Sequence, residues 1–144
     1  MPFSGIEATI IAQKLKTKAR CREAASKQEL KKNCHAKVIH ISTHGFSDYT
    51  TDNWLSHGIV MAGAENWLQK EQSSWSRDNG ILTADEITRL NLSGTNLFVL
   101  SACSSGLEAP GESSENSGLR TALQIAGAQY VISSLWDLYD FSCA

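Results

Sequence analysis

The sequence predicts an α/β domain with a mostly parallel sheet that is flanked by helices. Three short runs of β-branched and apolar residues, at 38–42, 97–102 and 130–133, are typical of strands buried on both faces. Stretches with helical spacing separate these runs, as in β–α–β connections. The chain has 144 residues, 42% of them hydrophobic and 19% charged, which suits about one globular domain. We therefore expect residues 1–144 to form a single domain.

The first helices are predicted from capping residues and from the spacing of apolar positions. Ser4 followed by Glu7 has the spacing of a capping box, and isoleucines at helical spacing follow it. We expect a helix over 4–16 on this basis. The basic and polar stretch that follows predicts a second, short helix near 27–32.

Between the first two long strands the sequence is mostly typical of loops. Residues 46–57 are polar, and residues 63–80 have no clear periodicity. A short strand is predicted at 57–62, where Ile59 and Val60 lie together.

Two more helices are predicted in the second half of the chain. Thr83 and Glu86 form another capping box at the start of the amphipathic stretch "LTADEITRL". The stretch 117–126 carries one apolar stripe, and Gly127 follows it at the position where a helix often ends.

Composition argues against several classes of function. No apolar run reaches the roughly 18 residues of a transmembrane helix, and no signal peptide is recognisable, so we expect a cytoplasmic protein without membrane contact. The formal net charge of −2 argues against general nucleic-acid binding. The cysteines include no C-x-x-C pair, so we expect free thiols, and neither a metal nor another cofactor. The four cysteines of the chain are Cys21, Cys34, Cys103 and Cys143.

Reactive residues follow two of the predicted strands. "VIHISTHG" ends in His44 and Gly45, and "LFVLSAC" ends in Cys103. Because parallel strands bring their carboxyl ends to one edge of the sheet, the imidazole and the thiol could meet there. A thiol assisted by an imidazole is a strong nucleophile, and the glycine lets backbone N–H groups approach a substrate carbonyl.

Each of these residues also has an ordinary structural explanation. A cysteine at a strand end is often a small core residue, and a histidine near an apolar run is often a hydrogen-bonded core residue. Other hydrolytic mechanisms fit less well, because the sequence has neither G-x-S-x-G nor H-E-x-x-H. The residues alone therefore leave a catalytic pair and two packing residues as open alternatives.

Three segments resemble a CHAT domain: "VIHISTHG", "NGILTADEITRLNLSGTNLFVLSACSSG" and "GLRTALQIAGAQYVISSLWDLYD". The resemblance covers about Ser4 to Asp140. It implies the caspase-like three-layer sandwich of a clan of cysteine peptidases distantly similar to caspases and separases, often next to tetratricopeptide repeats. "GESSENSGL" departs from the family pattern in the loop after the cysteine. The family's first strand would precede residue 1 and further elements would follow "LWD", so the resemblance implies a partial domain, truncated at both ends.

The resemblance implies specific roles at the two strand ends. His44 matches the catalytic histidine, and Cys103 matches the nucleophile. The backbone N–H groups of Gly45 and Cys103 match the oxyanion hole. His40 also falls where the family commonly carries a histidine, and its place within the strand makes it a packing or supporting residue rather than a base.

The segment "SSLWDLYD" supplies the expectation about specificity. In caspase-like folds this region lines the pocket for the side chain that precedes the scissile bond. Asp137 or Asp140 in that pocket would pair with a guanidinium, which predicts cleavage of protein substrates after Arg or Lys. Alternatively, Asp137 caps the next element and Asp140 is solvated. A catalytically inactive pseudo-peptidase that acts as an interaction module is the second functional hypothesis.

Overall fold

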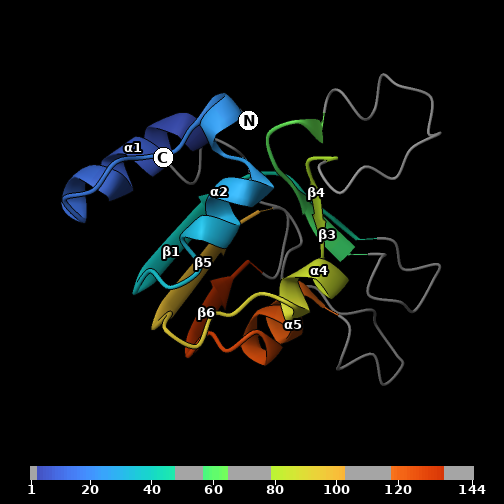
Figure 1. Ribbon diagram of the computed structural model, residues 1–144. Coiled ribbons are helices and arrows are strands. Elements are labelled where there is room, and N and C mark those ends of the chain that lie inside the picture. Colours follow the sequence, from blue (N-terminus) through green and yellow to red (C-terminus); the bar gives the residue numbers. More distant parts are fainter. Residues whose placement is uncertain (1–2, 48–56, 65–78, 103–117, 135–144) are drawn as a thin grey trace.

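The computed structural model describes residues 3–47, 57–64, 79–102 and 118–134. They form two small sheets with helices packed around them (Figure 1). The parallel sheet lies between helices, and the antiparallel sheet extends from one end of it.

The parallel sheet has the three strands that the sequence predicts. They are β1 (Val38–Ser42), β5 (Leu97–Ser101) and β6 (Tyr130–Ser133), in the order β1-β5-β6. All pairings are parallel, and Ser42 lies opposite Ser101. The central strand is buried most deeply: Phe98 is 1% exposed and Leu100 2%. The predicted α/β fold with a parallel sheet and flanking helices is confirmed.

The antiparallel sheet was only partly expected. It consists of β2 (Gly45–Ser47), β3 (His57–Val60) and β4 (Ile81–Thr83). The strand at β3 is confirmed. The assignment of residues 46 and 47 to a loop is wrong, and Leu82, which was expected in the apolar stripe of the following helix, lies in β4 instead. Strands of three residues are too short to show an alternating pattern.

The helices are α1 (Ser4–Lys14), α2 (Lys27–Lys32), α4 (Ala84–Thr88) and α5 (Leu119–Ile125), with a short 3₁₀ turn, η1 (Arg22–Ala24). Helix α1 packs against β1, and α5 packs against β6 and α4. The four predicted helices are thus confirmed: α2 has the predicted bounds, and the other three are somewhat shorter than predicted. Gly127 follows α5 with φ of 106°, the left-handed conformation that the sequence predicts.

The two capping-box predictions have opposite outcomes. Thr83 and Glu86 form the reciprocal box at the start of α4, as predicted. The box at Ser4 is wrong, because the N-cap is Phe3 and no side chain caps this helix. Glu7 instead turns its carboxylate to the sheet, where it has hydrogen-bond donors.

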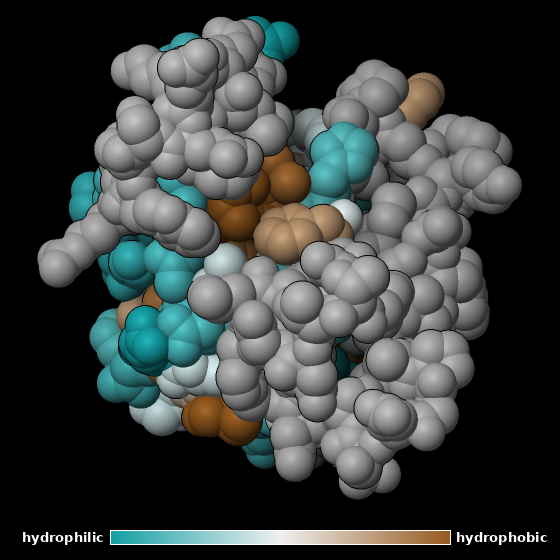
Figure 2. All heavy atoms as spheres, turned by 90° about the vertical axis from the view of Figure 1, so that its right-hand side faces the viewer, coloured by the Kyte–Doolittle hydropathy of each residue, from teal (hydrophilic) through white to brown (hydrophobic). Residues whose placement is uncertain are grey.

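One apolar core joins the sheets and the helices. It is built mainly from the face of the parallel sheet opposite α1 and from β3, β4, α4 and α5. The fully buried large side chains are Phe98, Ile59, Leu82, Ile87, Leu92, Leu100, Leu119 and Leu123. On the side of the molecule that Figure 2 shows, apolar side chains reach the surface in the middle of the view, with hydrophilic residues beside them.

A buried ion pair ties α2 to α4. The Lys27 ammonium lies 2.7 Å from Oε1 and 2.8 Å from Oε2 of Glu86, and its side chain is 2% exposed. Glu86 therefore serves both the capping box and this ion pair. Only the first of these roles can be predicted from the sequence pattern.

Two of the cysteines lie among the described residues. Cys21 and Cys34 both have free thiols, and Cys34 is buried. Within the part of the chain that is described, no helix combines the length and the apolar character needed to cross a membrane.

Candidate active site

The end of β1 is held in place by backbone hydrogen bonds to both sheets. The N–H of Thr43 donates to the carbonyl of Ser101 at 3.0 Å, which continues the parallel pairing. The carbonyl of His44 accepts from the N–H of Val60 at 2.9 Å, and the Thr43 hydroxyl donates to the Val60 carbonyl. His44 thus lies at the junction of the two sheets with a fixed backbone and an exposed side chain.

The backbone N–H of Gly45 is directed away from β3. His44 and Val60 are a hydrogen-bonded pair, so the next pair, Gly45 with Ile59, is of the non-hydrogen-bonded kind. In such a pair the N–H groups point outward. This orientation suits a donor to a substrate oxygen.

Gly58 makes room for the aromatic ring that follows Gly45. Phe46 lies opposite Gly58 in the antiparallel pair, and a Cβ atom at Gly58 would collide with the Phe46 ring. The glycine therefore fixes where this ring packs, next to the strand end that carries His44.

The end of β5 is fixed as well. Ser101 is 8% exposed and Ala102 is 0% exposed. The Ala102 carbonyl accepts a hydrogen bond from the Ser134 hydroxyl at 2.8 Å. Both strand ends thus lie at one edge of the parallel sheet, as predicted.

Three of the predicted site residues lie outside the described residues: Cys103, Asp137 and Asp140. His44 and Gly45 are described, and they lie where the sequence predicts them. The pairing of His44 with Cys103 and the pocket role of the two aspartates stay predictions.

A polar cluster lies beneath the two strand ends. Glu7 of α1 is 7% exposed, and its carboxylate contacts His40 and Ser42 of β1 and Ser101 of β5. His40 thus lies within the strand and contacts Glu7, and its supporting role stays a prediction. The sequence contained a signal for the cluster, because His40 and Ser42 are two apart and share one face of a strand.

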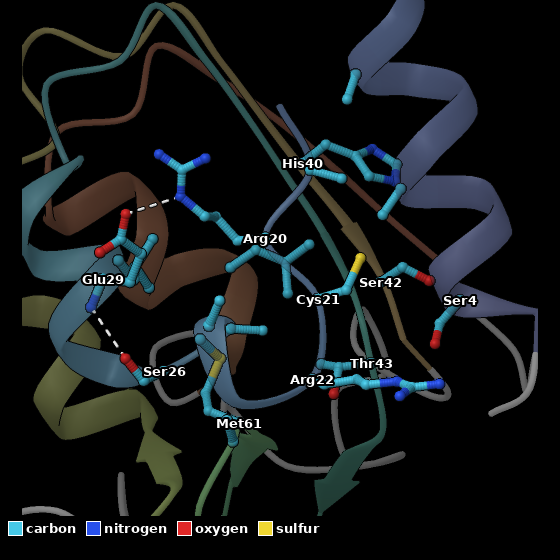
Figure 3. Close-up of a pocket in the computed structure, with 18 of the residues that line it drawn as sticks. Ser4, Arg20, Cys21, Arg22, Ser26, Glu29, His40, Ser42, Thr43 and Met61 are labelled. Carbon is cyan, nitrogen blue, oxygen red and sulfur yellow. Dashed lines mark hydrogen bonds and ion pairs between the residues drawn. The ribbon is translucent and has the colours of Figure 1, made fainter. Parts of the chain in front are cut away.

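A groove of about 1120 Å³ runs between α1, the η1 segment and β1. Figure 3 looks into it: Ser4 comes from α1, and His40 and Ser42 come from β1. Arg20 and Cys21 come from the segment between α1 and α2. No pattern in the sequence predicts this groove.

An ion pair forms part of the groove wall. The Arg20 guanidinium donates to Glu29 at 2.9 Å, and this hydrogen bond lowers the pKa of the Glu29 carboxyl from its usual value of 4.5. Ser26 caps α2 beside it, accepting from the Glu29 N–H at 3.2 Å (Figure 3). The pair links the first turn of α2 to the segment that precedes it.

Metal binding finds no support in the described ranges. They contain no group of three or more His, Cys, Asp or Glu side chains that could hold an ion.

Comparison with protein families matches residues 1–143 to the CHAT domain. No curated protein was found to be similar to the chain. The match covers nearly the whole chain, and the parallel sheet with its flanking helices is consistent with a caspase-like fold. The chain therefore belongs to the CHAT-domain family, which is related to the caspase-like peptidases.

Proposed function

We propose that this domain is a cysteine endopeptidase of the caspase-like type, with Cys103 as nucleophile and His44 as its acid–base partner. The Cys103 sulfur attacks the carbonyl carbon of the scissile peptide bond and forms a thioester. His44 gives a proton to the leaving amine and then takes one from the water that hydrolyses the thioester. The N–H groups of Gly45 and Cys103 stabilise the oxyanion.

The observation that carries the proposal is the matched ending of β1 and β5. Ser42 and Ser101 are paired, and His44 and Cys103 each follow two residues later in the sequence. The exposed side chain of His44 and the outward N–H of Gly45 support the proposed roles. Membership of the CHAT family supports the reaction class.

The proposed substrates are proteins or peptides with Arg or Lys before the scissile bond. Asp137 or Asp140 supplies the carboxylate that pairs with the basic side chain, and Asp137 is the preferred determinant. The chain has no Lys or Arg after Arg120, so this region offers no cation for an acidic substrate. Neither a nucleic acid nor a membrane takes part in the proposed reaction.

The setting of the proposed enzyme is the cytoplasm, where thiols stay reduced. The free thiols of Cys21 and Cys34 are compatible with that setting. We further propose that residues 1–144 act as one CHAT-domain unit and that tetratricopeptide-repeat segments are its partners.

An inactive pseudo-peptidase is the alternative. It would keep the fold and act as an interaction module without turnover. The presence of both His44 and Cys103 favours the enzyme, because an interaction module needs neither group.

The rate of cysteine alkylation by iodoacetamide distinguishes an active peptidase from an inactive pseudo-peptidase. Mass spectrometry of the intact chain measures the rate at each cysteine, with Cys34 as the buried control and Cys21 as the partly exposed control. If the domain is an active enzyme, Cys103 should be alkylated much faster than Cys21, and His44→Ala should remove this difference in rate. Labelling of Cys103 no faster than Cys21 would contradict the proposal.

A further inference from the structure

A single buried carboxylate connects the ends of β1 and β5. Oε2 of Glu7 lies 2.5 Å from the Ser42 hydroxyl and 3.4 Å from the Ser101 hydroxyl. Oε1 lies 2.9 Å from Nε2 of His40. An ionised carboxylate only accepts hydrogen bonds, so in that state the two serines and the histidine are the donors.

The cluster is more polar than helix packing requires. Glu7 and Ser101 are 7% and 8% exposed. An alanine or leucine at each position would attach α1 to the sheet without placing polar groups in a buried site, where they need partners. Hydrogen bonds, unlike apolar contacts, fix both the distance and the direction between the groups they join.

The positions of the donors define what the cluster can do. Ser42 is the last residue of β1, and Ser101 is the last residue of β5. The same carboxylate oxygen faces both hydroxyls, so it sets the spacing of the two strand ends from the side of α1. His40 holds the other oxygen and fixes the orientation of the carboxylate.

We propose that Glu7 is a positioning residue that fixes the strand ends from which His44 and Cys103 follow. This inference rests on the proposed function. Glu7 touches neither reacting group; it acts through Ser42 and Ser101, each two residues before one of them. The part of α1 that aligns the proposed site is thus this one carboxylate, not the packing of the helix as a whole.

The test compares Glu7→Ala with Glu7→Gln in the full chain. We measure the iodoacetamide rate at Cys103 as a function of pH, and thermal unfolding alongside it. Glu7→Ala should slow the His44-dependent reaction on the order of tenfold to a hundredfold, since displacements of about 1 Å have effects of this size. Glu7→Gln keeps an oxygen that accepts from the serines and should restore most of the rate.

The control is Ala12→Gly, which loosens the same helix without touching the carboxylate. Ala12 is buried on α1 at 7% exposure. The Ala12→Gly substitution should lower the unfolding temperature and leave the rate of iodoacetamide reaction at Cys103 unchanged. If Ala12→Gly slows Cys103 as much as Glu7→Ala does, Glu7 only attaches the helix and the proposal is overturned.

Further outcomes separate this proposal from the enzyme assignment. If wild-type Cys103 reacts no faster than Cys21, the proposed function fails and this inference fails with it. If wild-type Cys103 is fast and Glu7→Ala is equally fast, only the positioning role is overturned. If Glu7→Ala does not fold, Ser42→Ala takes its place, because it removes the shortest of the three contacts: a slower rate supports the role and an unchanged rate refutes it.

Discussion

Replacing Lys27 with methionine tests the buried ion pair that joins α2 to α4. The ammonium has four acceptors: both oxygens of Glu86 at 2.7 and 2.8 Å, the Ile81 carbonyl at 2.7 Å and the Asn79 side chain at 3.2 Å. Methionine keeps most of the aliphatic stem and removes the charge. The carboxylate of Glu86 then stays in place without its cation.

The expected loss is about 3 kcal/mol. Breaking a buried ion pair by removing one partner costs about 3–5 kcal/mol. We expect the lower end because the Glu86 side chain is 27% exposed and still accepts from the Thr83 N–H. With a slope of about 2 kcal/mol per molar urea, the midpoint of unfolding should fall by about 1.5 M.

Arg89→Met is the matched control for this experiment. Arg89 pairs with Asp85 at 2.7 Å on the surface of α4, with its side chain 71% exposed. Exposed pairs of this kind contribute about 0.5 kcal/mol or less. If Lys27→Met shifts the midpoint no more than this control does, the ion pair does not hold α2 to α4. Adding Glu86→Gln to Lys27→Met should recover part of the loss, because it removes the unpaired charge.

Three further predictions concern backbone conformation, pH and specificity. Gly127→Ala should destabilise the fold by more than about 1 kcal/mol in urea unfolding. The reason is that φ is +106° and the new Cβ atom would lie 2.9 Å from a backbone nitrogen. An unchanged midpoint of unfolding would contradict this backbone strain. The lowered pKa of Glu29 means that its pair with Arg20 stabilises the fold above about pH 4.5 and that this contribution is lost as pH falls through the folded-state pKa. Arg20→Gln should therefore lower the unfolding temperature at about pH 6 and have no effect at about pH 2; equal effects at both would contradict this. In a fluorogenic peptide panel, Asp137→Asn should reduce the preference for Arg and Lys more than Asp140→Asn does, whereas a wild-type preference for Asp or Glu would refute the proposed pocket.

The parallel sheet could be predicted because its strands are long enough to carry a pattern. Three of the five residues of Val38–Ser42 and four of the five of Leu97–Ser101 are β-branched or apolar, and the two strands are paired as expected. The three-residue strands Gly45–Ser47 and Ile81–Thr83 have no such pattern. Their strand conformation comes from pairing with β3, a non-local contact that short sequence windows do not contain.

The two candidate capping boxes show that sequence spacing alone does not decide whether a capping box forms. Ser4–Glu7 and Thr83–Glu86 have the same spacing, yet only the second forms. Glu7 faces donors on β1 and β5, and their hydrogen bonds compete with the local cap. Tertiary partners, which are distant in sequence, decided the outcome.

The strand end that carries His44 could be predicted from the sequence, but the contacts that support it could not. His44 follows by two residues the last residue of a strand that ends beside β5, as the sequence predicts. The contacts of Glu7 with His40 and Ser42 depend on how α1 packs on the sheet, and no spacing rule gives that packing. The role of Cys103, which lies outside the described residues, stays a prediction.

The most direct test of the central claim is peptide cleavage by the full chain and by two variants. A fluorogenic peptide with Arg before the scissile bond should be hydrolysed by the wild type. Cys103→Ala and His44→Ala should each lower kcat/KM by several powers of ten, roughly 10³-fold or more, with the fold intact by circular dichroism. Undiminished cleavage by Cys103→Ala, or no cleavage of any peptide by the folded wild type, would contradict the account.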